Sequence, residues 1–282
     1  MLSLVRVPTT LGKTALYLLL LAWATFSVLP FWWAFSSSFK RSVEIFAYPP
    51  RFFPPRLDPW NYANLLTKEY FLRWLINSLA LACTVTILVL FLCSMAGFAF
   101  AKYEFRFKNE LFTIMLGSLI IPFQLIMTPL YAQMNTLRWL NTYWALIVPW
   151  IAPAYGIFLM RQYMTTIPSE LIDAARIDGC SEFRIYAQIV IPLARPALGA
   201  LAIYQFTGSW NSYLWPMIVL RDRDLYTLPV GLATLTSEVW SQAIDYGMVM
   251  AAAFLSAMPI IIVFLFMQRQ FISGLTLGSV KA

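Results

Sequence analysis

Six long runs without a charged side chain dominate this sequence. No Asp, Glu, Lys or Arg interrupts any of them. They are Ala15–Phe39, Trp74–Ala101, Leu111–Leu137, Trp139–Met160, Ala197–Leu220 and Tyr246–Gln268. Each exceeds the roughly 20 apolar residues that a helix needs to cross the hydrocarbon core of a bilayer. Because a backbone in lipid must satisfy its own hydrogen bonds, the runs predict an all-α transmembrane protein with six helices over residues 15–268.

The composition agrees with a lipid environment. Of the 282 residues, 60% are hydrophobic and 12% are charged, about half the charged fraction of an ordinary soluble domain. The net charge of +7 falls mostly between the apolar runs, where contact with anionic lipid explains it better than nucleic-acid binding does. Three cysteines without metal-ligand spacing and the absence of histidine give no expectation of a metal site.

Charge patterning gives an expected orientation. The run after Arg6 and Lys13 is too long for a signal peptide, so we expect a retained helix. If the N-terminal segment 1–14 is cytoplasmic, segments 102–110, 161–196 and the tail 269–282 are cytoplasmic too. These four hold 11 of the 20 Lys and Arg residues, against nine outside. The positive-inside rule therefore favours cytoplasmic termini by a small margin.

Prolines mark both a loop and the spans. Five lie within the loop 40–73, which favours an extended path there rather than a helix. Others lie inside the predicted spans, at Pro122, Pro129, Pro149, Pro153, Pro216 and Pro259. Each can kink its helix, either to form a cavity or hinge or only to pack, and the sequence leaves both interpretations open.

The loop Arg161–Pro196 is long and polar for a compact membrane protein. Pro168 suits the first turn of a helix, and Gly179 suits the left-handed position that ends one. Ser181 can cap a second helix, which we expect to end near Pro192 and Pro196. The loop is predicted to form two short helices joined by a glycine turn.

This loop resembles a known family motif. The stretch from Glu170 to Gly179, Glu-Leu-Ile-Asp-Ala-Ala-Arg-Ile-Asp-Gly, followed by Ile191-Pro192-Leu193 and Pro196, resembles the EAA loop of ABC-importer permeases. Asp173 replaces the usual first Glu of that motif. The tail Phe271–Ala282 and shorter stretches, such as Asn77-Ser78, Ala99–Tyr103, Trp210-Asn211 and Thr227–Leu232, are similar to the maltose-type (MalG-like) sugar permeases.

The resemblance implies a type I permease fold in which the first loop helix is a coupling helix that docks on an ATPase subunit. The implied coupling residues are Glu170, Asp173, Ala174, Ala175, Asp178 and Gly179. Leu171, Ala174, Ala175 and Asp178 are expected on one side of this helix, where the small Ala174-Ala175 surface would admit the partner. A surface helix lying on lipid is the alternative. The tail residues Gly274, Gly278 and Lys281 are expected to contact the ATPases, a frayed terminus being the alternative.

The energy source and the transported solute follow from the same analysis. Spans free of charge argue against a proton- or sodium-coupled carrier. Leu11-Gly12-Lys13-Thr14 is not a phosphate-binding loop, because Val7 stands where the pattern needs Gly. We therefore expect no cofactor in this chain and ATP with Mg²⁺ on partner ATPases. The expected partners are a second, homologous permease, two ATPase subunits and an extracytoplasmic sugar-binding protein.

Uncharged polar and aromatic side chains inside the spans suit a neutral, hydroxyl-rich solute. The candidate substrate path comprises Asn77, Gln124, Thr128, Gln205, Trp210, Asn211 and Tyr213. Bonds between helices are the alternative role for each. The expected function is therefore sugar or oligosaccharide import. A polyol or glycerol phosphate, a homodimeric pore, a self-contained carrier or channel, and a membrane enzyme are the alternatives.

Overall fold

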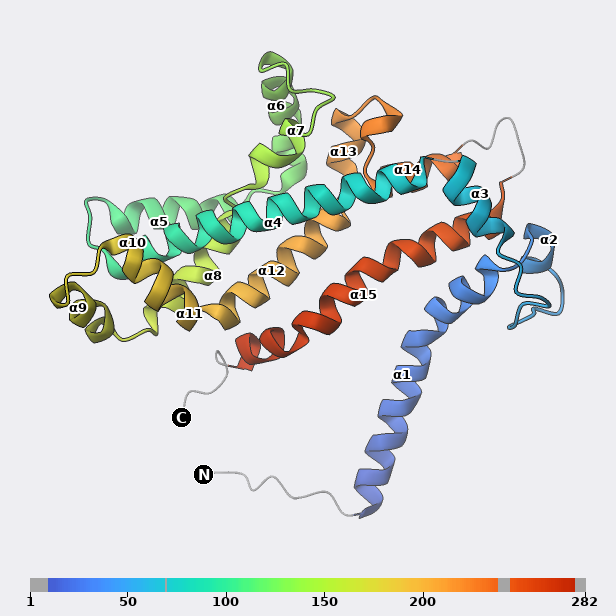
Figure 1. Ribbon diagram of the computed structural model, residues 1–282, viewed down its shortest axis with the longest axis horizontal. Helices are drawn as coiled ribbons and strands as arrows, with labels where there is room; N and C mark the ends of the chain where they lie inside the picture. Colours follow the sequence, from blue (N-terminus) through green and yellow to red (C-terminus); the bar gives the residue numbers. More distant parts are fainter. Residues whose placement is uncertain (1–9, 69, 238–243, 277–282) are drawn as a thin grey trace. The chain divides into compact units, whose positions relative to one another are not determined.

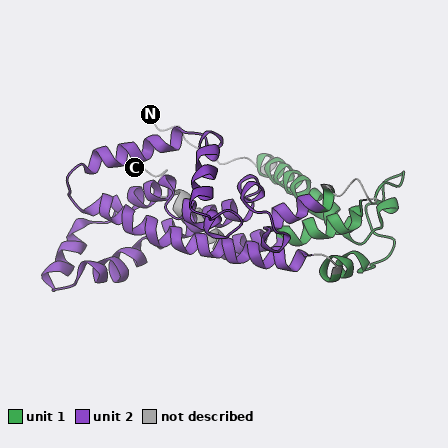
Figure 2. Cartoon of the chain, turned by 90° about the horizontal axis from the view of Figure 1, so that it is seen from above, with its two compact units in different colours: residues 1–69, 235–257 green, residues 70–234, 258–282 purple. Residues whose placement is uncertain are grey.

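The computed structural model describes residues 10–68, 70–237 and 244–276, and every element in those ranges is helical. The chain divides into two compact units, residues 1–69 with 235–257 and residues 70–234 with 258–282 (Figure 2). Within the described ranges, four helices are long and apolar enough to cross a membrane, and up to six spans are reached if each of two bent helix pairs counts as one.

The first unit contains α1 (Thr10–Ser38), α2 (Ser42–Ile45), α3 (Trp60–Lys68) and the first turns of α15 (Tyr246–Thr276) (Figure 1). The expectation of an extended path through the whole loop 40–73 is wrong, because α2 and α3 form within it. Residues 46–59, which hold all five prolines, are indeed free of helix. Helix α3 begins directly after Pro59, the last proline of the loop.

Side chains close the end of α1 in this unit. The side-chain amide of Asn61 donates to the carbonyls of Ser38 and Lys40, at 2.7 and 2.9 Å. The buried Lys40 ammonium donates to the carbonyl of Arg51 at 2.6 Å and lies over the Trp33 ring. Carbonyls at a helix C-terminus have no partner within the helix, so Asn61 supplies the donors that this end lacks.

The second unit is built on α4 (Phe71–Lys102), which packs against both α8 (Ala154–Thr165) and α12 (Arg195–Trp210) (Figure 1). Val85, Val89 and Cys93, four residues apart and fully buried, form the inward stripe of α4. Glycines bring α4 and α8 together: a Cβ on Gly97 would lie 2.6 Å from Met160 Cβ, and one on Gly156 would lie 2.8 Å from Cys93 Sγ. Membrane helices pack closely through such small residues.

Three of the predicted spans are not continuous helices. Helix α5 (Lys108–Gly117), extended by a 3₁₀ turn, is bent by 100° from α6 (Phe123–Thr136). The cause is Pro122, which lacks an N–H and holds Ile121 in an extended conformation (φ −80°, ψ 114°). A continuous helix over Leu111–Leu137 is therefore a wrong prediction.

A second break lies in the predicted span Ala197–Leu220. Helix α12 ends at Trp210, and α13 (Leu214–Val219) starts anew. Pro216 lies in the first turn of α13, where its ring avoids the clash with the carbonyl four residues back that it would make in the middle of a helix. In the predicted span Trp139–Met160, helix begins only at Trp144 and passes through α7 (Trp144–Ile147), a 3₁₀ turn and α8.

The loop helices complete the second unit. They are α9 (Ser169–Ile177), α10 (Glu182–Ile185), a π-helical turn (Tyr186–Val190) and α11 (Ile191–Leu193). The stretch Glu182–Leu193 is bent by 79° from α12, and Pro196 lies in the first turn of α12 rather than ending the helix before it. Helix α14 (Leu228–Ser237) follows a 3₁₀ turn at Arg223–Leu225.

Candidate functional site

The polar loop folds into two short helices joined by a tight glycine turn, as its punctuation residues predict. Gly179 adopts φ +80°, its N–H donates to the Arg176 carbonyl at 3.0 Å, and the Cys180 N–H donates to the Ala175 carbonyl at 3.0 Å. These two bonds define a Schellman motif. The Ser181 hydroxyl then accepts from the backbone N–H of Arg184 at 3.4 Å and caps α10. The turn is thus fixed by local hydrogen bonds.

The two faces of α9 differ from the expected arrangement in one respect. Ala175 is buried, 6% exposed, on the same inward side as Ile172. The prediction that Ala175 presents a small surface to a partner is therefore wrong, because tertiary packing has turned it inward. The outward side, called the α9 face below, is exposed. It consists of Glu170, Leu171, Ala174, Ile177 and Asp178.

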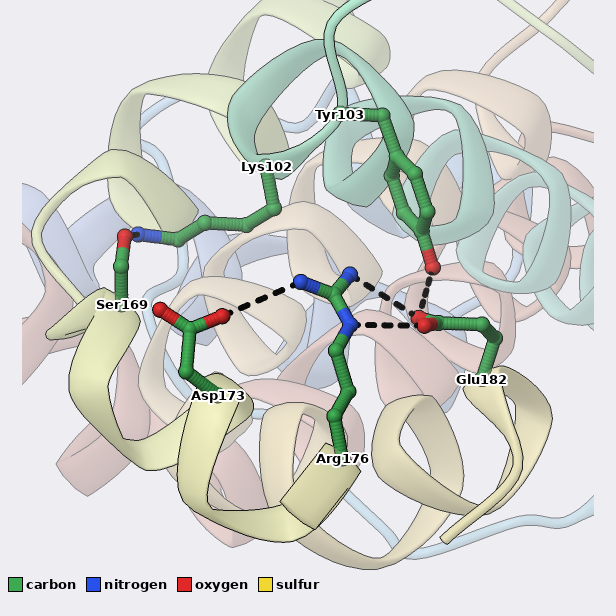
Figure 3. Close-up of polar contacts among 6 residues, drawn as sticks. All are labelled: Lys102, Tyr103, Ser169, Asp173, Arg176 and Glu182. Carbon is green, nitrogen blue, oxygen red and sulfur yellow. Dashed lines mark hydrogen bonds and ion pairs between the residues drawn. The ribbon is translucent and has the colours of Figure 1, made fainter. Parts of the chain in front are cut away.

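A charged cluster links the two loop helices to the end of α4 (Figure 3). The guanidinium of Arg176 donates to both carboxylate oxygens of Glu182, at 2.7 Å from Nε and 3.2 Å from Nη2. The Tyr103 hydroxyl, just beyond α4, also donates to Glu182. Arg176 donates in addition to Asp173 at 3.2 Å. Asp173 thus accepts through one carboxylate oxygen within the chain, while its side chain remains 63% exposed.

The cluster keeps its charges at neutral pH. Hydrogen bonds from Arg176 and Tyr103 hold the pKa of the Glu182 carboxyl below its ordinary value. The hydrogen bond to Glu182 raises the pKa of the Arg176 guanidinium. Burial and the neighbouring Glu182 raise the pKa of Tyr103, which keeps its donating proton. The Arg176 and Glu182 side chains are 37% and 49% exposed, so solvent screening limits the ion pair to about 1 kcal/mol.

The other residues expected to meet an ATPase lie at the chain's end. Gly274 belongs to α15, which continues to Thr276. Gly278 and Lys281 lie outside the described residues.

A cavity of ≈ 310 Å³ lies within the second unit, between α4, α8, α12 and α13. Its polar groups are supplied by Gln205, Ser209, Ser212, Tyr155 and Tyr204, and the two tyrosine rings are 4.6 Å apart. Leu81, Val85, Leu146, Trp150, Pro153, Gly208, Trp215 and Pro216 complete the lining. None of these lining residues is charged. Aromatic walls with a few neutral polar groups are typical of a small-molecule site.

The candidate path residues have different positions. Gln205 lines this cavity. Asn77 lines a smaller hollow of ≈ 130 Å³ and donates to the carbonyls of Asp224 and Tyr226 at 2.8 and 3.0 Å. Trp210 is buried, 3% exposed, beside Phe206 and does not line this cavity. The remaining candidates are exposed and lie outside the cavity lining: Gln124, Thr128, Asn211 and Tyr213.

Sequence reasoning missed Tyr155, Tyr204, Ser209 and Ser212 in the cavity. It also missed the pairing of Arg176 with Glu182. A basic and an acidic residue on opposite sides of a predicted glycine turn were a usable signal for that pair. The cavity residues carried no comparable signal, since their meeting depends on the break between α12 and α13.

The sequence profile described as "Binding-protein-dependent transport system inner membrane component" matches residues 93–276, which include both the loop and the cavity helices α8 and α12. The chain belongs to this family. It is therefore an inner-membrane permease subunit of an ABC importer and not itself an enzyme.

Relatives of the permease cover most of its length. It is 41% identical over 248 residues to the arabinooligosaccharides transport system permease protein AraQ of Halalkalibacterium halodurans, covering 87% of this chain and 88% of that one. It is 32% identical to the diacetylchitobiose uptake system permease protein NgcG of Streptomyces coelicolor, covering 93% and 87%. The fold matches a chain of a bacterial alginate ABC transporter with TM-score 0.80 at 24% identity, covering 92% and 96%.

Proposed function

We propose that this permease subunit moves a sugar or oligosaccharide into the cytoplasm by alternating access, driven by ATP that partner ATPase subunits bind with Mg²⁺ and hydrolyse. The observation that carries the carbohydrate assignment is the cavity between α4, α8, α12 and α13. Its polar groups are neutral and stand beside the tyrosine rings of Tyr155 and Tyr204. Such a lining can donate to and accept from hydroxyl groups and stack on sugar faces.

The names of relatives support the same class of solute. Arabinooligosaccharides and diacetylchitobiose appear in the descriptions of two of them. Another relative, 31% identical, is the sn-glycerol-3-phosphate permease UgpE of Escherichia coli. A phosphate monoester carries a charge that needs a basic partner, and the lining residues of the cavity include none. A neutral carbohydrate is therefore the better fit.

The proposed assembly contains a second, homologous permease, two ATPases and an extracytoplasmic binding protein. One alginate transporter with this fold has been solved with a pentasaccharide-bound periplasmic protein. Helix α1 is apolar, and no residue of its most apolar 18-residue window is buried within this chain. This exposure supports a contact of α1 with a partner subunit or with lipid. A heterodimer would allow each permease to contribute a different part of the path.

The α9 face supports docking on an ATPase. Leu171, Ala174 and Asp178 recur at helical spacing, and Ile177 is 87% exposed. An apolar side chain so exposed near acidic Glu170 and Asp178 suits a partner cleft with basic walls. Docking on a cytoplasmic ATPase would place this loop in the cytoplasm, and with six spans both termini would lie there too.

Uptake by the reconstituted complex tests the solute. The permease, co-expressed with its partner permease, ATPases and binding protein, is placed in liposomes and offered arabinooligosaccharides, diacetylchitobiose, lactose and glycerol phosphate. We expect ATP-dependent uptake of one carbohydrate and loss of that uptake in Gln205→Leu. The matched control is Gln133→Leu, at an exposed amide on α6. Uptake of glycerol phosphate alone, or transport without any ATPase subunit, would show the proposal to be wrong.

Co-purification tests the α9 face. Ile177→Glu places a charge in the proposed apolar contact, and we expect the ATPase subunits to be lost on purification in detergent. Asn109→Glu adds the same charge at an exposed position of α5 and serves as the control. Equal recovery of ATPase with both variants would contradict docking through this face.

A further inference from the structure

Helix α4 is joined by side-chain hydrogen bonds to a different loop at each of its ends. With 32 residues and a rise of 1.5 Å per residue, it is about 48 Å long, more than the hydrocarbon thickness of about 30 Å. It is therefore long enough for its ends to reach opposite membrane surfaces. Contacts made at these ends can connect events on the two sides of the bilayer.

The end at Lys102 holds the loop that contains α9. The Lys102 ammonium donates to the carbonyl of Ile167 and to the hydroxyl of Ser169 at 3.4 Å, where α9 begins. Tyr103 donates to Glu182, where α10 begins, and Glu182 holds Arg176 near the end of α9 (Figure 3). Helix α9 is thus tied to α4 at both of its ends.

The end at Phe71 holds a second segment, residues 223–231. The Trp74 indole donates to the carbonyl of Arg223 at 2.9 Å, and Asn77 donates to those of Asp224 and Tyr226. Ser78 is the residue after Asn77, and its hydroxyl accepts from the backbone N–H of Leu228 at 2.7 Å, at the start of α14.

Packing adds to these bonds, because Gly231 lies directly on the Trp74 ring. A Cβ there would come within 2.1 Å of that ring. Segment 223–231 is therefore attached to the first turns of α4 by both hydrogen bonds and packing.

Between these ends α4 is an unbroken helix. The printed sequence of α4 contains no proline, and its buried stripe packs on α8 and α12. A helix held in this way moves as a rigid body, since kinks arise mainly at prolines and similar interruptions. Displacement at Tyr103 is then carried to Asn77 without bending.

We propose that α4 transmits the movement of the coupling helix α9 to segment 223–231, and that Glu182 and Asn77 are the positioning residues that attach it at either end. This rests on the proposed function, since it requires that α9 moves with an ATPase. Neither residue needs to touch the solute or ATP for this role. Segment 223–231 would respond to the ATPases through α4 and so open or close the outer side of the path.

Two isosteric substitutions, each with a matched control, test this in the complete reconstituted complex. Glu182→Gln removes the carboxylate that joins Arg176 to Tyr103, and Glu104→Gln removes an exposed carboxylate paired with Lys108 at 2.9 Å. Asn77→Asp removes both donations to segment 223–231, and Asn135→Asp makes the same change at an exposed amide on α6. ATPase recovery, ATP hydrolysis and solute imported per ATP are measured for each.

We expect Glu182→Gln and Asn77→Asp to retain their ATPases and to hydrolyse ATP within about twofold of wild type, while solute imported per ATP falls about fivefold or more. Both controls should match wild type. If Glu182→Gln fails to assemble, Tyr103→Phe, which loses one hydroxyl and keeps its ring beside Phe98, carries the same expectation. If these residues had a merely structural role, the variants would show lower yield and thermal stability, but the solute imported per ATP would not change.

Two results overturn the inference in distinguishable ways. If wild type shows ATP-dependent uptake and both variants import as much solute per ATP as their controls, α4 does not transmit and the proposed function stands. If wild type itself shows no ATP-dependent uptake, the proposed function fails and the role of α4 fails with it.

Discussion

Gly97→Ala is the substitution whose effect the structure determines most directly. Gly97 lies on α4 where this helix crosses α8. A Cβ at this position would lie 2.6 Å from Met160 Cβ, 2.9 Å from the backbone nitrogen of Arg161 and 3.0 Å from the carbonyl carbon of Met160. Non-bonded carbon atoms prefer separations of about 3.5–4.0 Å, so the new methyl group lacks about 1 Å of space. Two of the three obstructing atoms belong to the backbone of α8 and cannot rotate away.

The expected loss follows from that overlap. Inserting a methyl group into a well-packed contact costs about 1–3 kcal/mol. For a chain of this size each 1 kcal/mol lowers the melting temperature by about 2–4 °C, so the expected decrease is about 2–12 °C. Alanine also favours helix over glycine by up to about 1 kcal/mol, which opposes the loss. A control must therefore contain the same gain in helix propensity without the overlap.

Gly117→Ala provides that control, because it also lies in a helix and a Cβ there meets nothing within 4 Å. Thermal unfolding of the purified complex in detergent, followed by the loss of monodisperse protein on size exclusion, compares the two variants with wild type. We expect Gly97→Ala to melt below wild type and Gly117→Ala to melt at or above it. A Gly97→Ala variant as stable as Gly117→Ala would refute the close approach of α4 and α8.

Three further predictions concern other contacts. Trp215→Phe removes the buried indole donor that meets the Ala145 carbonyl at 2.9 Å, and should destabilise the permease by about 1–3 kcal/mol; an unchanged melting temperature would contradict that bond. Asn61→Ala leaves two carbonyls at the end of α1 unpaired, and should lower stability by about 1–3 kcal/mol per carbonyl in the same assay. The pKa of Glu182 is lowered by Arg176, so its stabilising effect is complete above the ordinary Glu pKa of about 4.3 and is lost as pH falls through the lower folded pKa. The difference in melting temperature between wild type and Glu182→Gln should therefore stay constant from about pH 8 to pH 5.5, and a difference that shrinks within that range would contradict the sign of the shift.

Local rules explain why the polar loop was predictable. A proline before α9, a glycine in the left-handed region and a serine cap each act within a few residues. The turn at Gly179 and the cap at Ser181 could therefore be derived without knowledge of the fold. The inward side of α9 could not, because Ala174 and Ala175 are adjacent and equally small. Ala175 rather than Ala174 faces inward because Ile172 and Ala175 pack inside the chain. That packing involves residues far apart in the sequence.

The spans illustrate the same limit. The uncharged runs predicted where the spans lie, because about 20 consecutive apolar residues are enough to indicate a membrane helix without knowledge of the fold. A proline within a run either bends a helix or ends it, and neighbouring groups decide which. Pro129 and Pro259 stay inside helices, whereas Pro122 ends one. The cavity depends on such a break, so Gln205 was predicted from its polarity while Tyr155 and Tyr204 were not.

The glycine turn of the polar loop has a consequence for how the complex assembles. Its two backbone bonds and the Ser181 cap lie within the chain, so the loop does not need a partner to acquire its shape. Association of two preformed surfaces forfeits little conformational entropy, and the encounter rate is not limited by folding. Under the proposed function, exchange of an ATPase subunit would therefore not require this loop to refold.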